Sequence, residues 1–459
     1  MAPSKTRAGS VVGATYDVPL SSLSATELED EKEKLTMQPR AGFGVPPPAF
    51  PAFTVDDQYL RVPRFYGLER FGPAERDERV DGESIDIAFS GTLRPVQEEA
   101  REAALTHLQQ RSGGVIVVLP CGFGKTVLAT QLIASMGRKA AVLVHKAVIR
   151  DQWKAAFETF CPGVRVGIVQ GKTWEVQGFD VVICMVMTMA KRSYAASEMD
   201  AFGVVVCDEA HHLAAPVMGL AMRSFRARRI VGLTATKERP DGLTSLLHYA
   251  LGPEGFRVER DGGETVSVSV AVYPNAIKEV LTRDGKPLVS VMLNQLAAHG
   301  ARNRFIADRT VTMRRNGRNI LILSDRRGQI DTLHELLVER GVPAEQIGFF
   351  VGSTKETERA AQLERPIVLC TYQMANEGLD KRQADPIVFA TPKKRIVQAV
   401  GRIQRPCDTK QPPLVLDVAD DVSLFGSLRW QRQKLYGKEK YKIQVVHIAS
   451  DPEEDVWFT

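Results

Sequence analysis

The segment LPCGFGKT (Leu119–Thr126) has the residue types and spacing of a phosphate-binding turn. It follows a buried-strand pattern, Gly114–Leu119, and precedes a helix-like run, Val127–Ile133. In that setting backbone N–H groups and a helix N-terminus can hold phosphates, while Lys125 reaches the β- and γ-phosphates and Thr126 binds Mg²⁺. The turn itself consists of Pro120, Cys121, Gly122, Phe123 and Gly124. The common pattern has glycine at position 119, where this chain has leucine, and a purely structural glycine-rich turn is the alternative.

Two adjacent carboxylates, Asp208 and Glu209, follow a second apolar run, Val204–Cys207. Asp208 would hold Mg²⁺, and Glu209 would polarise the water that attacks a γ-phosphate. An Asp-Glu pair at a strand end is often only a solvated terminus. Its position some 80 residues after the turn, in the same predicted sheet, favours the functional interpretation.

The elements that must position these residues are short apolar strands alternating with helix-like segments. Such alternation predicts βαβ units on parallel sheets, and here it predicts two α/β domains. The predicted strands of the first are Gly114–Leu119, Ala140–Val144, Val181–Cys184, Val204–Cys207 and Ile230–Thr234. Those of the second are Asn319–Ser324, Gln346–Val351, Pro366–Cys370, Pro386–Ala390 and Leu414–Asp417.

The remaining segments predict smaller parts. We expect an N-terminal accessory region and linker at 1–85, the first domain at 86–255, a connecting segment at 256–284, the second domain at 285–425 and a C-terminal tail at 426–459. Ser24–Glu27 has the form of a capping box and predicts a short helix, supported by Glu29 with Lys32 and Asp30 with Lys34. Tyr59–Tyr66 indicates a strand and turn, and alternating valines at 266–272 indicate a strand in the connecting segment.

Composition sets outer limits. The chain is 44% hydrophobic and 25% charged, which excludes a disordered or collagen-like body. Its net charge of +5 permits a nucleic-acid partner without requiring one. We find no apolar run of 18 residues and no secretory signal, so we expect no membrane association. Six cysteines without a CxxC pair predict reduced thiols in an intracellular compartment, either cytoplasm or nucleus, and no zinc site.

The combination of the turn with Asp208-Glu-Ala-His211 resembles motif II of superfamily 2 helicases, in the DEAH form. The other motifs of that superfamily can be found in the same order. They are the adenine-reading segment Leu93–Gln97, motif Ia at His145–Trp153, motif III at Gly232–Thr236 with an extension at Arg239–Gly242, motif IV at Ile320–Asp325, motif V at Thr371 and Glu377–Asp380, and motif VI at Gln398–Arg405. Eight ordered elements are similar to XPB-like DNA translocases and to helicases of large DNA viruses.

The resemblance implies two tandem RecA-like domains, with ATP and Mg²⁺ as cofactors in the cleft between them. It assigns ATP contacts to Arg94, Gln97, Gly378 and Asp380, in addition to the turn, and coupling to His211, Thr234, Ala235 and Thr236. Gln398, Arg402 and Arg405 would share one helix face and stabilise charge that develops during phosphoryl transfer. Lys146, Arg150 and Thr371 would contact the nucleic-acid backbone. Eight further arginines between Arg302 and Arg327 form either a solvated surface or another contact.

The function predicted from these residues is an ATP-dependent helicase or translocase that acts on DNA as a monomeric motor. The Arg239–Gly242 extension favours DNA over RNA. A role with transcription or replication machinery, in a host cell or a virion, would follow if the chain is viral. The alternatives are a DEAH-type RNA helicase and a nucleotide-dependent, non-hydrolysing interaction subunit. A restriction-enzyme motor subunit would require a nuclease constellation, which the sequence does not contain.

Overall fold

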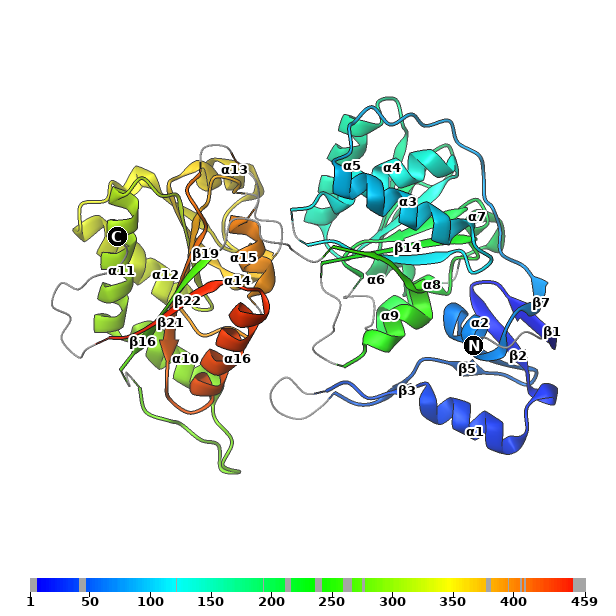
Figure 1. Ribbon diagram of the computed structural model, residues 1–459, viewed down its shortest axis with the longest axis horizontal. Coiled ribbons are helices and arrows are strands. Elements are labelled where there is room, and N and C mark those ends of the chain that lie inside the picture. The colour runs from blue at the N-terminus through cyan, green and yellow to red at the C-terminus, as the bar shows by residue number, and fades with distance from the viewer. Residues whose placement is uncertain are drawn as a thin grey trace. The chain divides into compact units, whose positions relative to one another are not determined.

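The computed structural model divides the chain into two compact units, Met1–Glu259 and Arg260–Thr459. It describes residues 6–40, 47–120, 122–192, 194–210, 216–235, 242–258, 266–274, 277–376, 381–394, 396–404, 407 and 410–448. Each unit contains a large, mainly parallel β-sheet with helices on its faces (Figure 1). The predicted α/β class, with two parallel-sheet domains and a small N-terminal module, is confirmed.

The large sheet of the first unit has eight strands in the order β11-β10-β12-β9-β13-β14-β8-β15. Only β11 runs antiparallel to its neighbour. The strands are β8 (Gly114–Val118), β9 (Ala140–Val144), β10 (Val166–Gln170), β11 (Thr173–Trp174), β12 (Val181–Met185), β13 (Val204–Cys207), β14 (Arg229–Thr234) and β15 (Glu254–Arg257). Because parallel strands end at one edge, the turn after β8, Asp208 after β13 and Thr234 at the end of β14 meet there.

Seven helices of this unit accompany the sheet: α3 (Pro95–Gln109), α4 (Lys125–Met136), α5 (Ala147–Phe160), α6 (Val186–Met189), α7 (Ala196–Met199), α8 (Pro216–Met222) and α9 (Thr244–Leu251). Alternate residues of β8 enter two separate cores. Val115 and Val117 pack with α3, α4 and α5, whereas Ile116 and Val118 pack with α8 and α9. The sheet is therefore buried on both faces, which is why its strands are continuous apolar runs.

The N-terminal module is a second, five-stranded sheet within the first unit, in the order β5-β6-β2-β1-β7. Its elements are β1 (Arg7–Val12), β2 (Thr15–Pro19), α1 (Ala25–Lys34), β5 (Thr54–Val55), β6 (Tyr59–Pro63), α2 (Arg64–Phe71) and β7 (Ala74–Asp77), with a separate pair β3 (Thr36–Met37) and β4 (Phe50–Pro51). Ser24 caps α1 through the predicted capping box. Two details are corrected: Lys34 pairs with Glu31 and not with Asp30, and Arg64–Tyr66 begins a helix where a turn was predicted.

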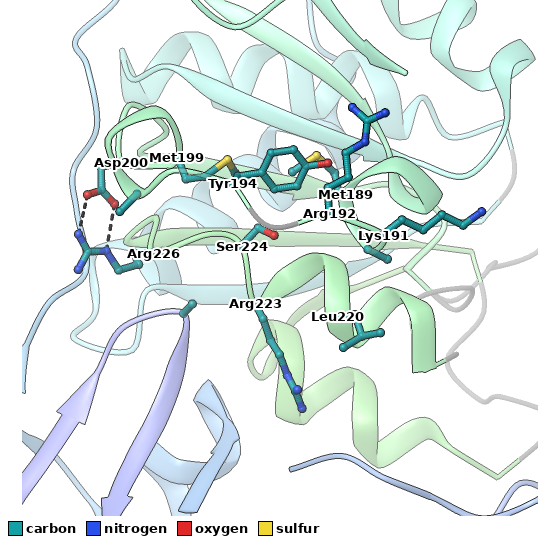
Figure 2. A pocket seen from close by; sticks show the side chains of 13 residues that line it. Met189, Lys191, Arg192, Tyr194, Met199, Asp200, Leu220, Arg223, Ser224 and Arg226 are labelled. Atoms are coloured by element: carbon teal, nitrogen blue, oxygen red, sulfur yellow. Dashed lines mark hydrogen bonds and ion pairs between the residues drawn. The ribbon is translucent and has the colours of Figure 1, made fainter. Parts of the chain in front are cut away.

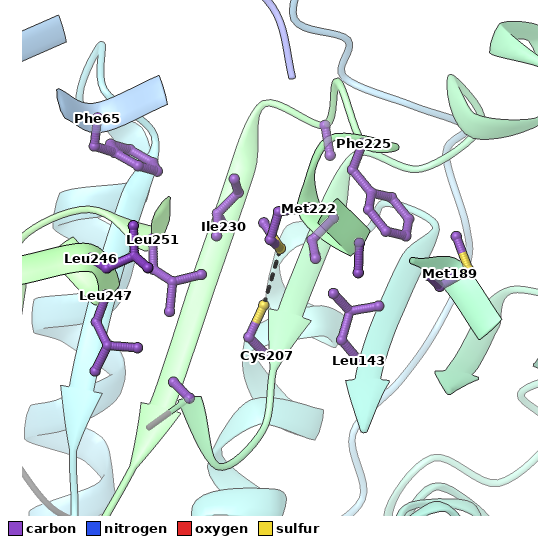
Figure 3. Packing of buried hydrophobic residues seen from close by; sticks show 14 of the residues in the cluster. Phe65, Leu143, Met189, Cys207, Met222, Phe225, Ile230, Leu246, Leu247 and Leu251 are labelled. Atoms are coloured by element: carbon purple, nitrogen blue, oxygen red, sulfur yellow. Dashed lines mark hydrogen bonds between the residues drawn. The ribbon is translucent and has the colours of Figure 1, made fainter. Parts of the chain in front are cut away.

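Helix α2 joins the module to the large sheet. The buried guanidinium of Arg64 donates to the carbonyl oxygens of Ala227 at 2.7 Å and Phe225 at 3.0 Å, just before β14. Arg226, which lies between these two residues in the sequence, forms an ion pair with Asp200 at 3.0 Å (Figure 2). Phe65 packs in the same core as Leu251 (Figure 3), and its ring lies where a Cβ at Gly114 would be. The module and the first α/β domain thus share one core.

The second unit has a seven-stranded sheet whose pairings are all parallel, in the order β18-β19-β17-β20-β21-β16-β22. The strands are β16 (Ser267–Tyr273), β17 (Ile320–Ser324), β18 (Ile347–Phe350), β19 (Ile367–Thr371), β20 (Pro386–Phe389), β21 (Leu414–Asp420) and β22 (Lys442–His447). The helices are α10 (Val289–Ala298), α11 (Gly300–Arg315), α12 (Arg327–Glu339), α13 (Glu356–Glu364), α14 (Tyr372–Asn376), α15 (Val397–Ile403) and α16 (Leu424–Lys438).

The segment predicted to connect the domains contributes strands to both. Glu254–Arg257 pairs with β8 in the first unit, and Ser267–Tyr273 pairs with β21 and β22 inside the second. The described residues of the segment 256–284 thus contribute to both large sheets. In the range predicted as a tail, α16 packs in a core of the second unit and β22 pairs with β16. Within the part of the chain that the structure describes, every helix is too short or too polar to span a bilayer.

Candidate active site

The glycine-rich turn after β8 has the backbone that a phosphate-binding turn needs. The φ angle is +85° at Gly122 and +75° at Gly124, a left-handed conformation that glycine adopts without steric cost. Helix α4 begins at Lys125, so the N–H groups of its first turn point toward the glycines. The Nζ of Lys125 donates to the carbonyl oxygen of Leu119 at 3.3 Å, which folds the ammonium back over the turn. The turn can therefore hold a polyphosphate.

Arg94 and Gln97 hold the same turn in place. The amide nitrogen of buried Gln97 donates to the carbonyl oxygens of Phe123 and Gly124, each at 3.1 Å. Its amide oxygen accepts the backbone N–H of Arg94 at 2.8 Å, and the Arg94 guanidinium donates to the Gly122 carbonyl at 3.3 Å. The Gln97 amide nitrogen therefore braces the loop directly, and Arg94 braces it through Gly122. The predicted contacts of both residues with ATP stay a prediction.

Asp208 lies at the end of β13 and is only 7% exposed. One of its carboxylate oxygens accepts the indole N–H of Trp153 at 2.8 Å, and the other accepts the backbone N–H of Glu209 at 2.8 Å. Burial, reinforced by the charge of Glu209, raises the pKa of Asp208 to about 6, whereas the Trp153 bond and the charge of Lys125 oppose the rise. A nearby cation would favour the ionised carboxylate still further.

Glu209 follows with a φ of +47°, in the left-handed region that non-glycine residues rarely adopt. Such a backbone costs roughly 1–2 kcal/mol for an L-residue and persists where the surrounding structure imposes it. The backbone N–H of Glu209 donates to the Asp208 carboxylate, whose other oxygen is held by Trp153. The half-buried Glu209 carboxylate lies close enough to Asp208 for its charge to raise the pKa of that carboxyl.

The donor atoms at this edge fit MgATP. Asp208 and Thr126 offer oxygen atoms, which Mg²⁺ prefers, and Mg²⁺ in nucleotide sites uses one or two carboxylates and completes its shell with phosphate oxygens and water. Among the described residues no group of three or more His, Cys, Asp or Glu side chains could hold a metal ion alone. Asp208 and Thr126 would therefore supply only part of the Mg²⁺ coordination shell, and phosphate oxygens and water would supply the rest.

The predicted coupling segment is hydrogen-bonded to Leu119, the residue that leads into the turn. The carbonyl oxygen of buried Thr234 accepts the N–H of Leu119 at 2.9 Å, and Ala235 follows at the same edge. In the second unit Arg402 is 8% exposed on α15, and its charge opposes the rise that burial gives the pKa of Cys370. The other predicted residues lie outside the described part of the chain: Cys121, His211, Thr236, Gly378, Asp380, Arg405 and the side chain of Gln398.

The predicted nucleic-acid contacts come from the start of α5 in the first unit and the end of β19 in the second. Lys146 caps α5 at the end of β9, at the same sheet edge. The Arg150 guanidinium is engaged with Asp151 at 2.7 Å and with Gln170, so a phosphate would have to replace these partners. Thr371 ends β19 in the second unit.

The arginines between 302 and 327 do not form one basic patch. Arg302 is fully buried and pairs with Asp420 at 3.0 Å. Arg318 pairs with Asp385, and Arg327 with Asp331. Three of the eight arginines in the run thus form ion pairs, and that of Arg302 lies in the core.

Trp153 is the site residue that sequence reasoning missed. Its side chain is fully buried in the core formed by α3, α4 and α5. A buried indole N–H still needs a hydrogen-bond acceptor, and here the acceptor is the Asp208 carboxylate. The need for such an acceptor is the signal that could have identified Trp153 as a site residue.

The chain resembles known proteins over most of its length. The family profile described as "Type III restriction enzyme, res subunit" matches residues 90–239. The L396 protein of Acanthamoeba polyphaga mimivirus, provisionally named an ATP-dependent RNA helicase, is 30% identical over 409 residues, which cover 87% of this chain and 78% of that protein. The similarly named QP509L protein of African swine fever virus (isolate Pig/Kenya/KEN-50/1950) is 24% identical over 422 residues, 85% of this chain and 82% of that protein.

A solved structure shares the fold. The Type ISP restriction-modification enzyme LlaBIII bound to DNA aligns with a TM-score of 0.57 at 15% identity, covering 79% of this chain. This chain spans only 32% of that larger enzyme. The extent and identity of the mimivirus match, together with the ordered motifs, show that the chain belongs to the superfamily 2 helicases, in the group found in large DNA viruses.

Proposed function

We propose that the chain is an ATP-hydrolysing motor that translocates along DNA. The observation that carries the proposal is the buried Asp208 carboxylate, on which the charge of Lys125 acts, at the sheet edge that also bears the glycine-rich turn. A phosphate-binding turn beside an acidic strand end supports nucleotide hydrolysis, because the two halves of a Mg²⁺–phosphate site are then adjacent.

The residues divide the chemistry among them. Bound MgATP would supply the γ-phosphoryl group and the cation that polarises it. Lys125 and the N–H groups of the turn would hold the phosphates, Thr126 and Asp208 would hold the cation, and Glu209 would take a proton from the attacking water. The resemblance assigns to Gln398, Arg402 and Arg405 the stabilisation of charge on the transferred group.

DNA is the proposed substrate. The restriction-enzyme profile over residues 90–239 and the DNA-bound structural neighbour support it. RNA is a second candidate, because the mimivirus and African swine fever virus relatives carry the names of RNA helicases. The viral relatives further support a role in the transcription or replication of a large DNA virus, and we propose that the motor acts there as a monomer.

The test is the ATPase rate of the purified chain without nucleic acid and with duplex DNA, single-stranded DNA or RNA. We expect DNA to stimulate the rate, and we expect Glu209→Gln to lower it by about 10²–10⁴-fold while ATP still binds, because the general base is lost. Stimulation by RNA alone would replace DNA with RNA as the substrate. Nucleotide binding without hydrolysis under any condition would refute the motor and favour a nucleotide-dependent interaction subunit.

A further inference from the structure

The segment 390–394, which leads from β20 toward α15, is held by groups from two other parts of the second unit. The hydroxyl of Tyr372, the first residue of α14, donates to the carbonyl oxygen of Thr391 at 2.8 Å. The Thr391 hydroxyl accepts the backbone N–H of Asp325, the residue after β17, at 2.9 Å. Tyr372 and Thr391 are both buried, so water does not compete for these two hydrogen bonds.

Lys393 makes a second set of contacts around the same segment. Its ammonium group lies 2.8 and 2.9 Å from the two carboxylate oxygens of Asp325 and 5.1 Å from the ring centroid of Tyr372. Arg432 of α16 adds a longer hydrogen bond, of 3.4 Å, to the carbonyl oxygen of Lys393. Asp325 therefore binds the segment twice, through its backbone and through its carboxylate. We refer to Asp325, Tyr372, Thr391 and Lys393 together as the clasp.

The hydroxyl of Tyr372 is well suited to hold a backbone carbonyl. Burial raises the pKa of Tyr372 well above its ordinary value, so the hydroxyl keeps its proton and donates it. Its ring also stacks on Phe389 at the end of β20, with 6.1 Å between the ring centroids. The ring and the hydroxyl thus fix the end of the strand and the segment that follows it.

The clasp lies directly before the helix that carries Arg402. Helix α15 begins at Val397, and Ala399 and Val400 pack in the same core as Tyr372. Helices α14 and α15 are neighbours in the second unit (Figure 1). Arg402, at 8% exposure, has little freedom to move independently of its helix. Its position therefore depends on where the clasp lets α15 begin.

Position matters for a group that stabilises developing charge. Such a group acts only when its donors reach the oxygen atoms on which the charge develops. A misplacement of about 1 Å, even one caused far from the reacting atoms, can slow a reaction by about 100-fold. The clasp contacts are hydrogen bonds and an ion pair that a single substitution can remove, so their effect on the reaction can be measured.

We propose that Tyr372 and Lys393 are positioning residues for ATP hydrolysis, which hold the segment 390–394 and thereby place Arg402 for phosphoryl transfer. The proposal rests on the proposed function, because it takes α15 as the helix that stabilises the transferred group. It adds two residues to the arginines that the resemblance assigns to this step.

The first test is steady-state ATP hydrolysis by the full chain, with the nucleic acid that stimulates the wild type most. Tyr372→Phe keeps the ring but loses the donor. It should lower kcat by about tenfold or more and leave the KM for ATP unchanged, because the phosphates bind in the first unit. The control is Tyr436→Phe, which should keep the wild-type kcat. Tyr436 is also buried in this core, but its hydroxyl donates to Asp417 at 2.8 Å and not to the segment.

Lys393 provides an independent arm of the same test. Lys393→Met should also lower kcat, whereas Lys393→Arg can still pair with Asp325 and should recover most of the lost rate. The double variant Tyr372→Phe/Lys393→Met should lose less than the product of the two single losses, because both side chains act on one segment. A wild-type kcat in Lys393→Met, with more nucleic acid needed for half-maximal stimulation, would overturn the positioning role and make Lys393 a nucleic-acid contact.

Hydrogen exchange followed by mass spectrometry tests the clasp without ATP. Backbone amides of residues 396–403 should exchange faster in Tyr372→Phe than in the wild type or in Tyr436→Phe, since local opening becomes easier. Equal exchange in all three proteins, or equal kcat in the two variants, would overturn the proposal. A wild-type chain that hydrolyses no ATP with any nucleic acid would refute the proposed function instead, and the exchange rates would still show whether Tyr372 holds α15.

Discussion

The indole N–H of Trp153 lies 2.8 Å from a carboxylate oxygen of Asp208, and both side chains are buried. Trp153 comes from the middle of α5 and Asp208 from the end of β13, so the bond ties a core helix to the proposed metal ligand. The other Asp208 oxygen accepts the N–H of Glu209. The rotamer of the carboxylate is therefore set before any cation arrives, which is how outer partners orient metal ligands.

Trp153→Phe should raise the Mg²⁺ concentration needed for half-maximal ATP hydrolysis by about 10–100-fold, the usual effect of losing such an outer partner. The phenyl ring preserves most of the packing but cannot donate a hydrogen bond. The measurement is the ATPase rate against Mg²⁺ at saturating ATP. Trp174→Phe is the matched control, since Trp174 also donates its N–H to a carboxylate, that of Glu198 at 3.0 Å, outside the site. Equal Mg²⁺ dependence in the two variants would contradict a positioning role for Trp153.

Gly124→Ala should abolish detectable ATP binding or weaken it by at least tenfold. A Cβ there would lie 2.5 Å from the Gln97 amide nitrogen, on a backbone with φ of +75°. The brace between Gln97 and the turn would then have to break. Nucleotide affinity by titration calorimetry gives the answer. Gly178→Ala provides the comparison, because Gly178 has a φ of +80° but nothing within 4 Å of the added atom. If both variants bind ATP like wild type, the brace is unimportant for the loop.

Strand ends could be predicted from the sequence because buried parallel strands are continuous apolar runs, and their carboxyl ends share an edge. Val204–Cys207 and the Asp208 that follows are an example. The strand at 267–273 was predicted from its alternating valines, but the pattern did not show that it belongs inside a sheet. Ser269 is in fact fully buried, and the strand lies between β21 and β22. Small polar residues that fit an interior position do not reveal their burial in a pattern.

Side-chain partners were predicted less well than elements. Arg302 belonged to an apparent basic run, yet it is buried and pairs with Asp420, 118 residues away in sequence. Trp153 likewise finds its acceptor 55 residues away. The spacing of apolar residues predicts which face of a helix is buried, but it does not predict which distant atom forms a hydrogen bond with a buried side chain. Such partners are set by the tertiary structure.

Glu31→Gln should destabilise the N-terminal module by about 2 kcal/mol at neutral pH, the typical cost of leaving buried polar partners poorly satisfied. Although burial alone would raise it, hydrogen bonds from Tyr66, Lys34 and Arg70 hold the pKa of Glu31 below its ordinary value. A lowered pKa means that the carboxylate stabilises the fold above the pKa of the unfolded chain, near 4.5, and that this contribution is lost as pH falls.

Melting temperatures of wild type and Glu31→Gln should therefore differ most near pH 7 and approach each other below about pH 4. Glu29→Gln is the control: its ion pair with Lys32 is exposed, and exposed pairs contribute little. A constant difference between Glu31→Gln and wild type across this range would show that the loss comes from packing and not from ionisation.

Arg432→Met should destabilise the second unit by about 3–5 kcal/mol, because it leaves the carboxylate of Asp417 buried without its cation. The two side chains form a fully buried ion pair at 2.9 Å, and Tyr436 donates its hydroxyl to the same carboxylate at 2.8 Å. Urea unfolding followed by circular dichroism measures the loss. Lys434→Ala, on the exposed face of the same helix, should stay within about 0.5 kcal/mol of wild type.

The double variant Arg432→Met/Asp417→Leu distinguishes two contributions to the free energy of unfolding. One is the cost of an unpaired buried charge, and the other is the net stabilisation by the ion pair. Replacing both partners of a buried ion pair with apolar side chains is often close to neutral. Here recovery should be incomplete, since the Tyr436 hydroxyl would lose its acceptor at a cost of about 1–3 kcal/mol. A double variant as unstable as Arg432→Met would mean that the arginine stabilises α16 through its packing on the sheet. Full recovery would mean that Tyr436 finds another acceptor when Asp417 is removed.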